Sequence, residues 1–147
     1  MRIDIPQEKH LAYETQFPIR WGEMDAFGHV NNVQFFRYLE NTRVDWLHSL
    51  RYVEPRDGEG VVVVNVFCNF YQQLLYPGNL LAKLYLTELG RRSFDHVVTF
   101  ERSDAPGTVV AAGGATIVWV NFAQGKALLL PEGLREVLTQ IQKTTQP

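Results

Sequence analysis

Residues 20–50, RWGEMDAFGHVNNVQFFRYLENTRVDWLHSL, decide the expected fold. Their apolar side chains recur at spacings of three and four residues, which predicts a helix that begins at Asn31 or Asn32 and continues to Leu50. The apolar face of this helix is widened by aromatic residues and interrupted by Arg43; its members are Phe36, Leu39, Leu47, Leu50, Phe35, Tyr38 and Trp46. A helix with so many aromatic residues on one side is expected to be wrapped by a sheet.

A short loop precedes this helix and carries an acidic residue, Asp25. Gly28 allows the loop to turn with a positive φ, and Asn31 and Asn32 are both suited to cap the helix. The free N–H groups and the positive dipole end of a first helical turn lie close to such a loop. These N–H groups can polarise a carbonyl while Asp25 attacks it or activates a water, so the arrangement predicts an enzyme. The alternative is that Asp25 only caps the helix or pairs with an arginine.

The composition is that of a globular protein with enough apolar residues for one core. The chain has 147 residues, of which 46% are hydrophobic, so we expect a single domain over residues 1–147, with loose ends at residues 1–11 and 143–147. The net charge of −2 at pH 7 does not indicate a nucleic-acid binder. The lone cysteine, Cys68, is expected in the core and fits a reducing compartment. Neither a signal peptide nor an apolar run that could cross a bilayer is present, so we expect a cytoplasmic protein outside the membrane.

The remaining sequence predicts strands and one further helix. A first strand is expected at residues 12–20, and four strand-like runs follow at residues 61–76, 80–89, 93–102 and 108–122. The apolar face expected for the first of these four runs consists of Val62, Val64, Val66, Cys68 and Phe70. Gly113 and Gly114 indicate a bulge or a close approach of another backbone, and Pro131 opens the second, short helix. This order of elements predicts an α+β fold with an antiparallel sheet around the long helix.

Several segments resemble one family of enzymes. The run GEMDAFGHVNN followed by QFFRYLE resembles the hotdog-fold acyl-CoA thioesterases of the 4-hydroxybenzoyl-CoA thioesterase type, and YPGNLL, LGRRSF and LPEGLREVL resemble later segments of that family. The resemblance extends over residues 13–138. It implies a hotdog fold, in which an antiparallel sheet of about five strands wraps around one long helix and a short helix ends the domain. It also implies an acyl-CoA substrate, no cofactor, and a homodimer or a tetramer of dimers with active sites at the subunit interface.

The same resemblance implies roles for individual residues. Asp25 matches the catalytic carboxylate of the family, acting as nucleophile on the thioester carbonyl or as general base for water, and the main-chain N–H of Asn32 matches the oxyanion hole. His29 is a further candidate for a catalytic role. The residues expected to bind substrate are Phe27, Gly28 and Val30 in the loop, and Arg91, Arg92 and Ser93 in a later turn, where charged donors suit the phosphates of coenzyme A. The sequence departs from related patterns at Phe27, where plant acyl-carrier thioesterases have Asn, and at Asn79, where Asp is usual.

Other assignments stay open at this level. Glu40 is the alternative catalytic carboxylate, although it is expected to pair with Arg43 on the helix. A hotdog dehydratase would need Asp25 together with His29 or His96, whereas His96 is expected to be a satisfied core or interface histidine. A further alternative is a protein that binds acyl-CoA without hydrolysing it. No clustered His or Cys spacing indicates a metal site. The acyl group, the choice between coenzyme A and an acyl carrier protein, and the choice between dimer and tetramer are not determined by the sequence.

Overall fold

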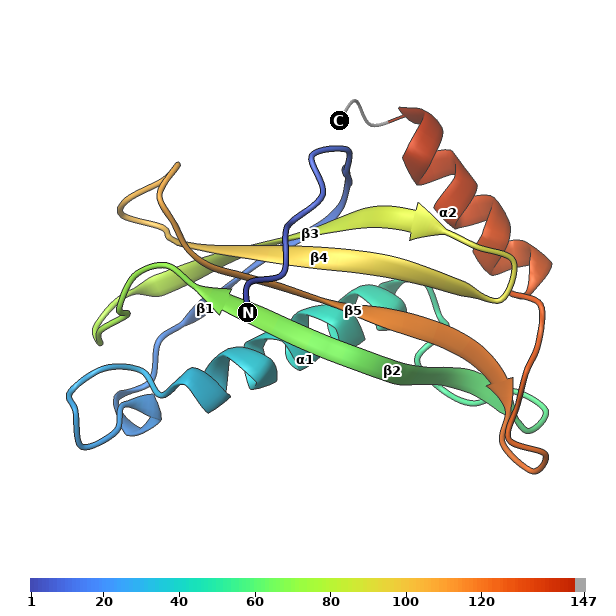
Figure 1. Cartoon of the computed structure of the whole chain (residues 1–147), viewed down its shortest axis with the longest axis horizontal. Helices are drawn as coiled ribbons and strands as arrows, with labels where there is room; N and C mark the ends of the chain where they lie inside the picture. The colour runs from blue at the N-terminus through green and yellow to red at the C-terminus, as the bar shows by residue number, and fades with distance from the viewer. Residues whose placement is uncertain (145–147) are drawn as a thin grey trace.

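The computed structural model describes residues 1–144, which form one sheet and two helices (Figure 1). In chain order the elements are β1 (His10–Pro18), the 3-10 turn η1 (Trp21–Glu23), α1 (Asn32–Ser49), β2 (Glu59–Phe70), β3 (Asn79–Leu89), β4 (Ser93–Arg102), β5 (Val109–Asn121), β6 (Lys126–Ala127) and α2 (Glu132–Thr144). The expected α+β order of strand, long helix, antiparallel strands and short helix is confirmed, and η1 and β6 are additions to it. Residues 143 and 144 belong to α2 and not to a loose end, while residues 145–147 lie outside the described part.

The sheet is antiparallel, with the strand order β1-β3-β4-β5-β2, and the short β6 pairs with β5. α1 lies along one face of this sheet (Figure 1). The core fills the space between them, because the even-numbered residues of β3 and β4 point toward the helix. Fully buried members of this core are Leu39 and Trp46 of α1, Leu80, Leu84 and Leu86 of β3, Val98 and Phe100 of β4, and Ile117 of β5.

β2 differs from its prediction in length and in register. It ends at Phe70, and a loop follows where the strand was expected to continue. A bulge between Val63 and Asn65 shifts the register against β5, so Val63 faces the helix on the same side as Val66. The expectation that Val62 shares that side is wrong, because one extra residue in a strand reverses the faces beyond it.

β2 also lies at a free edge of the sheet, where it pairs only with β5. Its side chains at Val63, Val64, Val66 and Phe70 are 43%, 58%, 45% and 44% exposed. Cys68 packs against the core from the helix-facing side, where burial raises the pKa of its thiol to about 12. This thiol therefore stays protonated and packs as a small apolar side chain.

The two adjacent glycines of β5 mark a close approach and not a bulge. The register of β5 runs unbroken through Gly113 and Gly114 against both β2 and β4. A Cβ at Gly113 would lie 2.4 Å from the Phe67 carbonyl oxygen of β2 and 2.8 Å from Leu39 Cδ1, so the absence of a side chain leaves room for the backbone of β2 and for α1.

The N-terminal arm is attached to the sheet. Residues 1–9 form no helix or strand, but Asn69 Nδ2 donates a hydrogen bond to the Ile3 carbonyl oxygen at 2.6 Å. β1 already starts at His10, two residues before the expected first strand and inside the expected loose end. In the described part of the chain, neither helix is long and apolar enough to span a membrane.

Candidate active site

The loop between η1 and α1 is closed on itself. Met24 pairs with Val30 in an isolated antiparallel bridge. Inside this bridge the Asp25 N–H donates to the His29 carbonyl oxygen at 3.0 Å, and the Gly28 N–H donates to the Asp25 carbonyl oxygen at 3.0 Å. Gly28 has a φ of 81°, which glycine adopts without steric cost. The loop therefore fixes Asp25 just before the start of α1.

The carboxylate of Asp25 is half-buried and held by two donors. Its Oδ1 accepts from the Phe27 N–H at 2.9 Å, and its Oδ2 accepts from Asn31 Nδ2 at 3.0 Å. Asn31 in turn caps α1, because its Oδ1 accepts from the Val33 N–H at 2.8 Å. Asp25 is therefore not the helix cap, and Asn31 links the acid directly to the helix start.

The first residue of α1 carries a free main-chain donor. The Gln34 N–H bonds to the Asn31 carbonyl oxygen at 2.9 Å, and the Val33 N–H is taken by the Asn31 side chain. Within residues 1–144, the N–H of Asn32 has no acceptor. It lies at the positive end of the helix dipole, so it can donate to a developing negative charge.

A cleft of about 310 Å³ opens beside this donor. Its walls combine the loop, the helix start and the segment after β2; they are His29, Val30, Asn32, Phe35, Phe70, Tyr71, Gln72, Gln73 and Leu74. Asp25 is not among them, but its N–H donates to the carbonyl oxygen of His29, which is one of them. A larger hollow of about 470 Å³ lies at the other end of α1. The smaller cleft is the candidate site, because Asn32 lines it and the loop that holds Asp25 supplies two of its walls, His29 and Val30.

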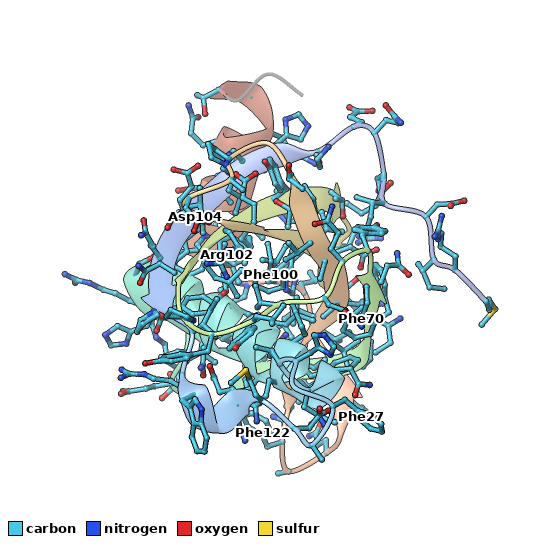
Figure 2. All side chains as sticks on the ribbon, turned by 90° about the vertical axis from the view of Figure 1, so that its left-hand side faces the viewer. Phe27, Phe70, Phe100, Arg102, Asp104 and Phe122 are labelled. Carbon is cyan, nitrogen blue, oxygen red and sulfur yellow. The ribbon has the colours of Figure 1, made fainter. Side chains whose placement is uncertain are left out.

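The segment after β2 is held in place by an arginine that sequence reasoning missed. Arg102 donates to the carbonyl oxygens of Leu75 at 2.8 Å and Pro77 at 2.7 Å, and Asp104 pairs with it at 2.9 Å. Figure 2 shows Arg102 and Asp104 together, with Phe27 at the periphery of the molecule. The Phe27 side chain is 86% exposed and does not line the cleft. No local sequence signal connects Arg102 to a segment some 25 residues away.

A second contact that the sequence did not predict joins the loop and η1 to α1. Tyr38 of α1 donates its hydroxyl to Glu23 Oε1 at 2.8 Å, and the Asn31 N–H donates to the Glu23 carbonyl oxygen at 3.0 Å. Burial, together with the hydrogen bond to the Glu23 carboxylate, raises the pKa of Tyr38 above its usual range. This hydroxyl therefore remains a donor and ties η1 to the helix.

The residues expected to bind substrate form two separate groups within a single chain. Loop residues 25–32 come together at the helix start, whereas Arg91, Arg92 and Ser93 lie at the other end of the sheet. This end is identified by Phe94, which packs on Trp46 with ring centroids 5.8 Å apart, near the C-terminal end of α1. α1 has 18 residues and is therefore about 27 Å long. Within one chain, the loop of residues 25–32 and the turn of residues 91–93 are therefore separated by roughly the length of α1.

The two helix residues expected to pair with each other do not. Glu40 Oε1 contacts Arg37 Nη1 at 2.5 Å, whereas Arg43 is buried, with 8% of its surface exposed. Burial lowers the pKa of Arg43, an effect that the charge of Glu40 partly offsets. Among residues 1–144, no three His, Cys, Asp or Glu side chains cluster closely enough to hold a metal ion.

His96 is buried as expected but is not satisfied. It is 1% exposed, packs beside Trp46 with ring centroids 6.3 Å apart, and neither ring nitrogen has a hydrogen-bond partner. Burial, with a smaller contribution from the charge of Arg43, lowers its pKa to about 3. Trp46 lies in the C-terminal half of α1, so His96 does not meet Asp25 to form a dehydratase-type pair.

Comparison with known proteins identifies the family of the chain. The sequence model of the thioesterase-like superfamily matches residues 19–138. The long-chain acyl-CoA thioesterase FadM of Escherichia coli K12 is 31% identical over 134 residues, which are 88% of this chain and 99% of FadM. A putative esterase of Aquifex aeolicus is 30% identical over 123 residues, 82% of this chain and 92% of that protein.

Solved structures agree with the sequence comparison. The PA2801 protein of Pseudomonas aeruginosa, a putative thioesterase, has a TM-score of 0.82 and 30% identity, and the match covers 87% of this chain and 98% of that one. The expected antiparallel sheet around a long helix and the expected class of enzyme, a thioester hydrolase, are thereby confirmed. With the family model matching most of the sequence and the fold agreeing, the chain is a member of the thioesterase-like superfamily.

Proposed function

We propose that this protein hydrolyses acyl-CoA thioesters at the cleft beside the start of α1. The observation that carries this proposal is the N–H of Asn32, which has no acceptor within residues 1–144 and directly follows Asn31, the residue that holds the Asp25 carboxylate. A thioester is already an activated acyl group, so the reaction needs an oxyanion donor, a base or nucleophile, and an apolar pocket. The membership of the thioesterase-like superfamily and the similarity to FadM support this reaction class.

The thioester oxygen is bound by the helix start. In our mechanism it accepts a hydrogen bond from the Asn32 N–H, which strengthens as negative charge develops on the oxygen. Asp25 takes a proton from a water molecule, and the resulting hydroxide attacks the carbonyl carbon. The C–S bond then breaks, and the proton passes from Asp25 to the departing coenzyme A thiolate. Direct attack by Asp25, with an anhydride that water later opens, uses the same geometry.

The hydrogen bonds of Asp25 suit either route. Each carboxylate oxygen accepts one bond from the protein, at 2.9 Å and 3.0 Å, and keeps acceptor capacity for a water or a substrate. His29 lines the cleft and is our candidate for assisting the proton transfer.

Aromatic side chains form the apolar wall for the acyl group. Phe35 packs edge-on against Phe70 at 5.4 Å and against Phe100 at 5.9 Å, and Leu74 closes the cleft from the segment after β2. Val30 of the loop lines the same cleft, so the acyl carbon nearest the thioester meets apolar surface.

We further propose that two copies of the chain pair along β2. The β2 edge is unpaired on one side and exposes Val63, Val64 and Val66. Antiparallel pairing of two β2 strands brings the Phe70 end of one copy to the Glu59 end of the other. Glu59 pairs with Asn121 of β5, close to the turn that carries Arg91 and Arg92.

This dimer explains why the expected substrate residues lie far apart in one chain. In the dimer, Arg91, Arg92 and Ser93 of one copy approach the cleft of the other and bind the phosphates of coenzyme A. Replacement of Val64 by Lys on the shared edge is expected to yield monomers with a raised KM for acyl-CoA. Sedimentation equilibrium measures the first effect and thiol release measures the second. A monomeric variant with an unchanged KM would exclude a site shared between copies.

The oxyanion donor can be removed without removing the helix. Proline is well tolerated at the first helical position and has no N–H, and Asn31 has the extended conformation that a residue before proline requires (φ −61°, ψ 139°). Asn32→Pro is therefore expected to lower kcat about 10²- to 10³-fold, whereas Asn32→Ala keeps the N–H and serves as the matched control.

The acid is tested in the same assay, which measures thiol release from short, long, branched and aromatic acyl-CoAs. Asp25→Asn is expected to reduce turnover by roughly 10²- to 10⁴-fold, and Asp45→Asn, at an exposed acid of α1, is the control. Full turnover by a folded Asp25→Asn variant would remove Asp25 from the mechanism. Binding of acyl-CoA without any thiol release by the native protein would favour a non-catalytic binder.

A further inference from the structure

One aromatic ring closes the cleft on the side of the core. Phe35 lines the cleft and is 3% exposed. Its ring packs edge-on against the rings of Tyr38 and Phe70, each with centroids 5.4 Å away, and against Phe100 with centroids 5.9 Å away. Edge-to-face contacts of this kind fix the orientation of a ring. Phe35 is therefore held by three neighbours and forms a fixed closed end of the cleft.

The space behind this ring is filled by the core. Tyr38 is 3% exposed, and Phe100 is fully buried in the interior of the molecule (Figure 2). Leu39, which follows on the buried side of α1, is 1% exposed, and a Cβ at Gly113 would lie only 2.8 Å from its Cδ1. Because a protein core is close-packed, a group in the cleft cannot pass the Phe35 ring without displacing it.

The segment after β2 forms another wall of the cleft and is tied at both of its ends. The N–H groups of Tyr71 and Gln72 donate to the Val110 carbonyl oxygen of β5, at 2.8 Å and 3.0 Å. At the other end, the Val30 N–H donates to the Leu74 carbonyl oxygen at 2.8 Å. Tyr71, Gln72 and Leu74 all line the cleft. These bonds hold the wall in place, so the cleft does not lengthen by movement of this segment.

The separation of the oxyanion donor from this ring sets a chain length. Asn32 and Phe35 are three positions apart in α1, which is a rise of about 4.5 Å at roughly 1.5 Å per residue. An oxygen that accepts from the Asn32 N–H lies ~3 Å before the helix start. Helical side chains lean toward the N-terminus, so an acyl chain meets the ring after roughly 7 Å at most. An extended chain covers this length with about six carbons, since each C–C bond advances it by roughly 1.25 Å.

We propose that Phe35 limits the length of the acyl group, so that the protein selects straight-chain acyl-CoA thioesters of about four to six carbons. Up to this length each CH₂ group is buried against the apolar walls, and its burial strengthens binding about fourfold. A longer chain has to leave the cleft at the ring, and its further carbons gain no burial there. This inference rests on the proposed thioesterase function and adds the class of acyl group to it.

The test is a chain-length series on the full chain. Thiol release is measured with acetyl-, butanoyl-, hexanoyl-, octanoyl-, decanoyl- and dodecanoyl-CoA. We expect kcat/KM to rise about fourfold for each added CH₂ group as far as hexanoyl-CoA, and then to stay level or fall. Phe35→Ala removes the ring and should move this break by about three carbons, because a phenyl ring extends ~4 Å beyond its Cβ.

The matched control is Phe17→Ala. Phe17 packs on the ring of Tyr38 with centroids 5.0 Å apart, as Phe35 does at 5.4 Å, but it does not line the cleft. We expect this variant to keep the break at hexanoyl-CoA. If Phe35→Ala does not fold, Phe35→Leu keeps most of the packing and should still move the break by about one carbon.

The outcomes separate this inference from the proposed function. Efficiency that rises through dodecanoyl-CoA, that is independent of chain length, or that breaks at a length no Phe35 variant moves, overturns the limit at Phe35 while the thioesterase stands. If no acyl-CoA is hydrolysed, the proposed function fails, and calorimetric binding of the same series decides on the inference. A break in affinity at hexanoyl-CoA that a Phe35 variant moves supports the closed end, whereas affinities without such a break, or no binding at all, refute it.

Discussion

His96 makes the stability of the fold depend on pH in a way that one substitution isolates. Its ring is 1% exposed, and burial followed by the charge of Arg43 lowers its pKa to about 3. In the unfolded chain a histidine has a pKa near 6.5. The folded protein therefore holds His96 neutral at a pH where the unfolded chain binds a proton.

The sign and the size follow from this difference. Because the folded pKa is the lower one, the contribution to stability is fully present above pH 6.5 and is lost as the pH falls toward 3. Each pH unit in this window changes the free energy of unfolding by about 1.4 kcal/mol. Between pH 7.5 and pH 4.5, protonation of His96 in the unfolded chain therefore removes about 3 kcal/mol of stability.

Replacement of His96 by Leu removes the titrating group and both unpaired nitrogens. We expect the variant to be at least as stable as the native protein at pH 7.5, because it buries no unsatisfied polar atom. Urea unfolding of both proteins at pH 7.5, 6.5, 5.5 and 4.5 gives the difference in the free energy of unfolding. This difference should grow by about 3 kcal/mol in favour of the variant toward pH 4.5.

Arg43→Met is the matched control for this experiment. It leaves His96 in place and removes only the smaller of the two causes of its lowered pKa, so the steep acid loss should largely persist. Parallel pH profiles of the native protein and His96→Leu would refute the reasoning, since they would mean that the ring is not held neutral by burial.

Three further substitutions test the packing and the site. Gly113→Ala places a methyl group 2.4 Å from the Phe67 carbonyl oxygen and 2.8 Å from Leu39 Cδ1 and should lower the free energy of unfolding by about 1–3 kcal/mol in urea titrations; no loss would mean that neither β2 nor α1 packs closely there. Asn31→Ala removes the helix cap and should cost about 1 kcal/mol in the same titration, with a clear drop in thiol release; a loss of stability with intact turnover would make the residue a cap only. Lys83→Met leaves Glu101, which is 4% exposed and 3.0 Å from the Lys83 ammonium, without its ion pair. Burial raises the pKa of Glu101, but the Lys83 and Gly107 hydrogen bonds outweigh it and hold that pKa below its usual value, so the loss of about 1–3 kcal/mol expected at pH 7 should shrink as the pH falls.

The sequence alone determined the elements that rest on local patterns. The apolar spacing of residues 32–49 predicted α1 almost to the residue, and the alternation in β4 gave both of its ends, because helical and extended backbones impose different periods on one buried face. The loop with Asp25, Gly28 and Asn31 was also predicted, since a tight turn and a helix cap are made within a few residues of chain.

Tertiary structure decided which side chains of different elements meet. Glu40 was expected to pair with Arg43, yet the rotation of α1 on the sheet buries Arg43 beside His96 and leaves Glu40 to Arg37. The bulge in β2 likewise depends on its partner strand, and a pattern of alternating residues does not reveal it. The physical reason is that a sequence pattern specifies which face of an element is apolar, whereas the rotation, register and neighbours of that element are set only when all of them pack into one core.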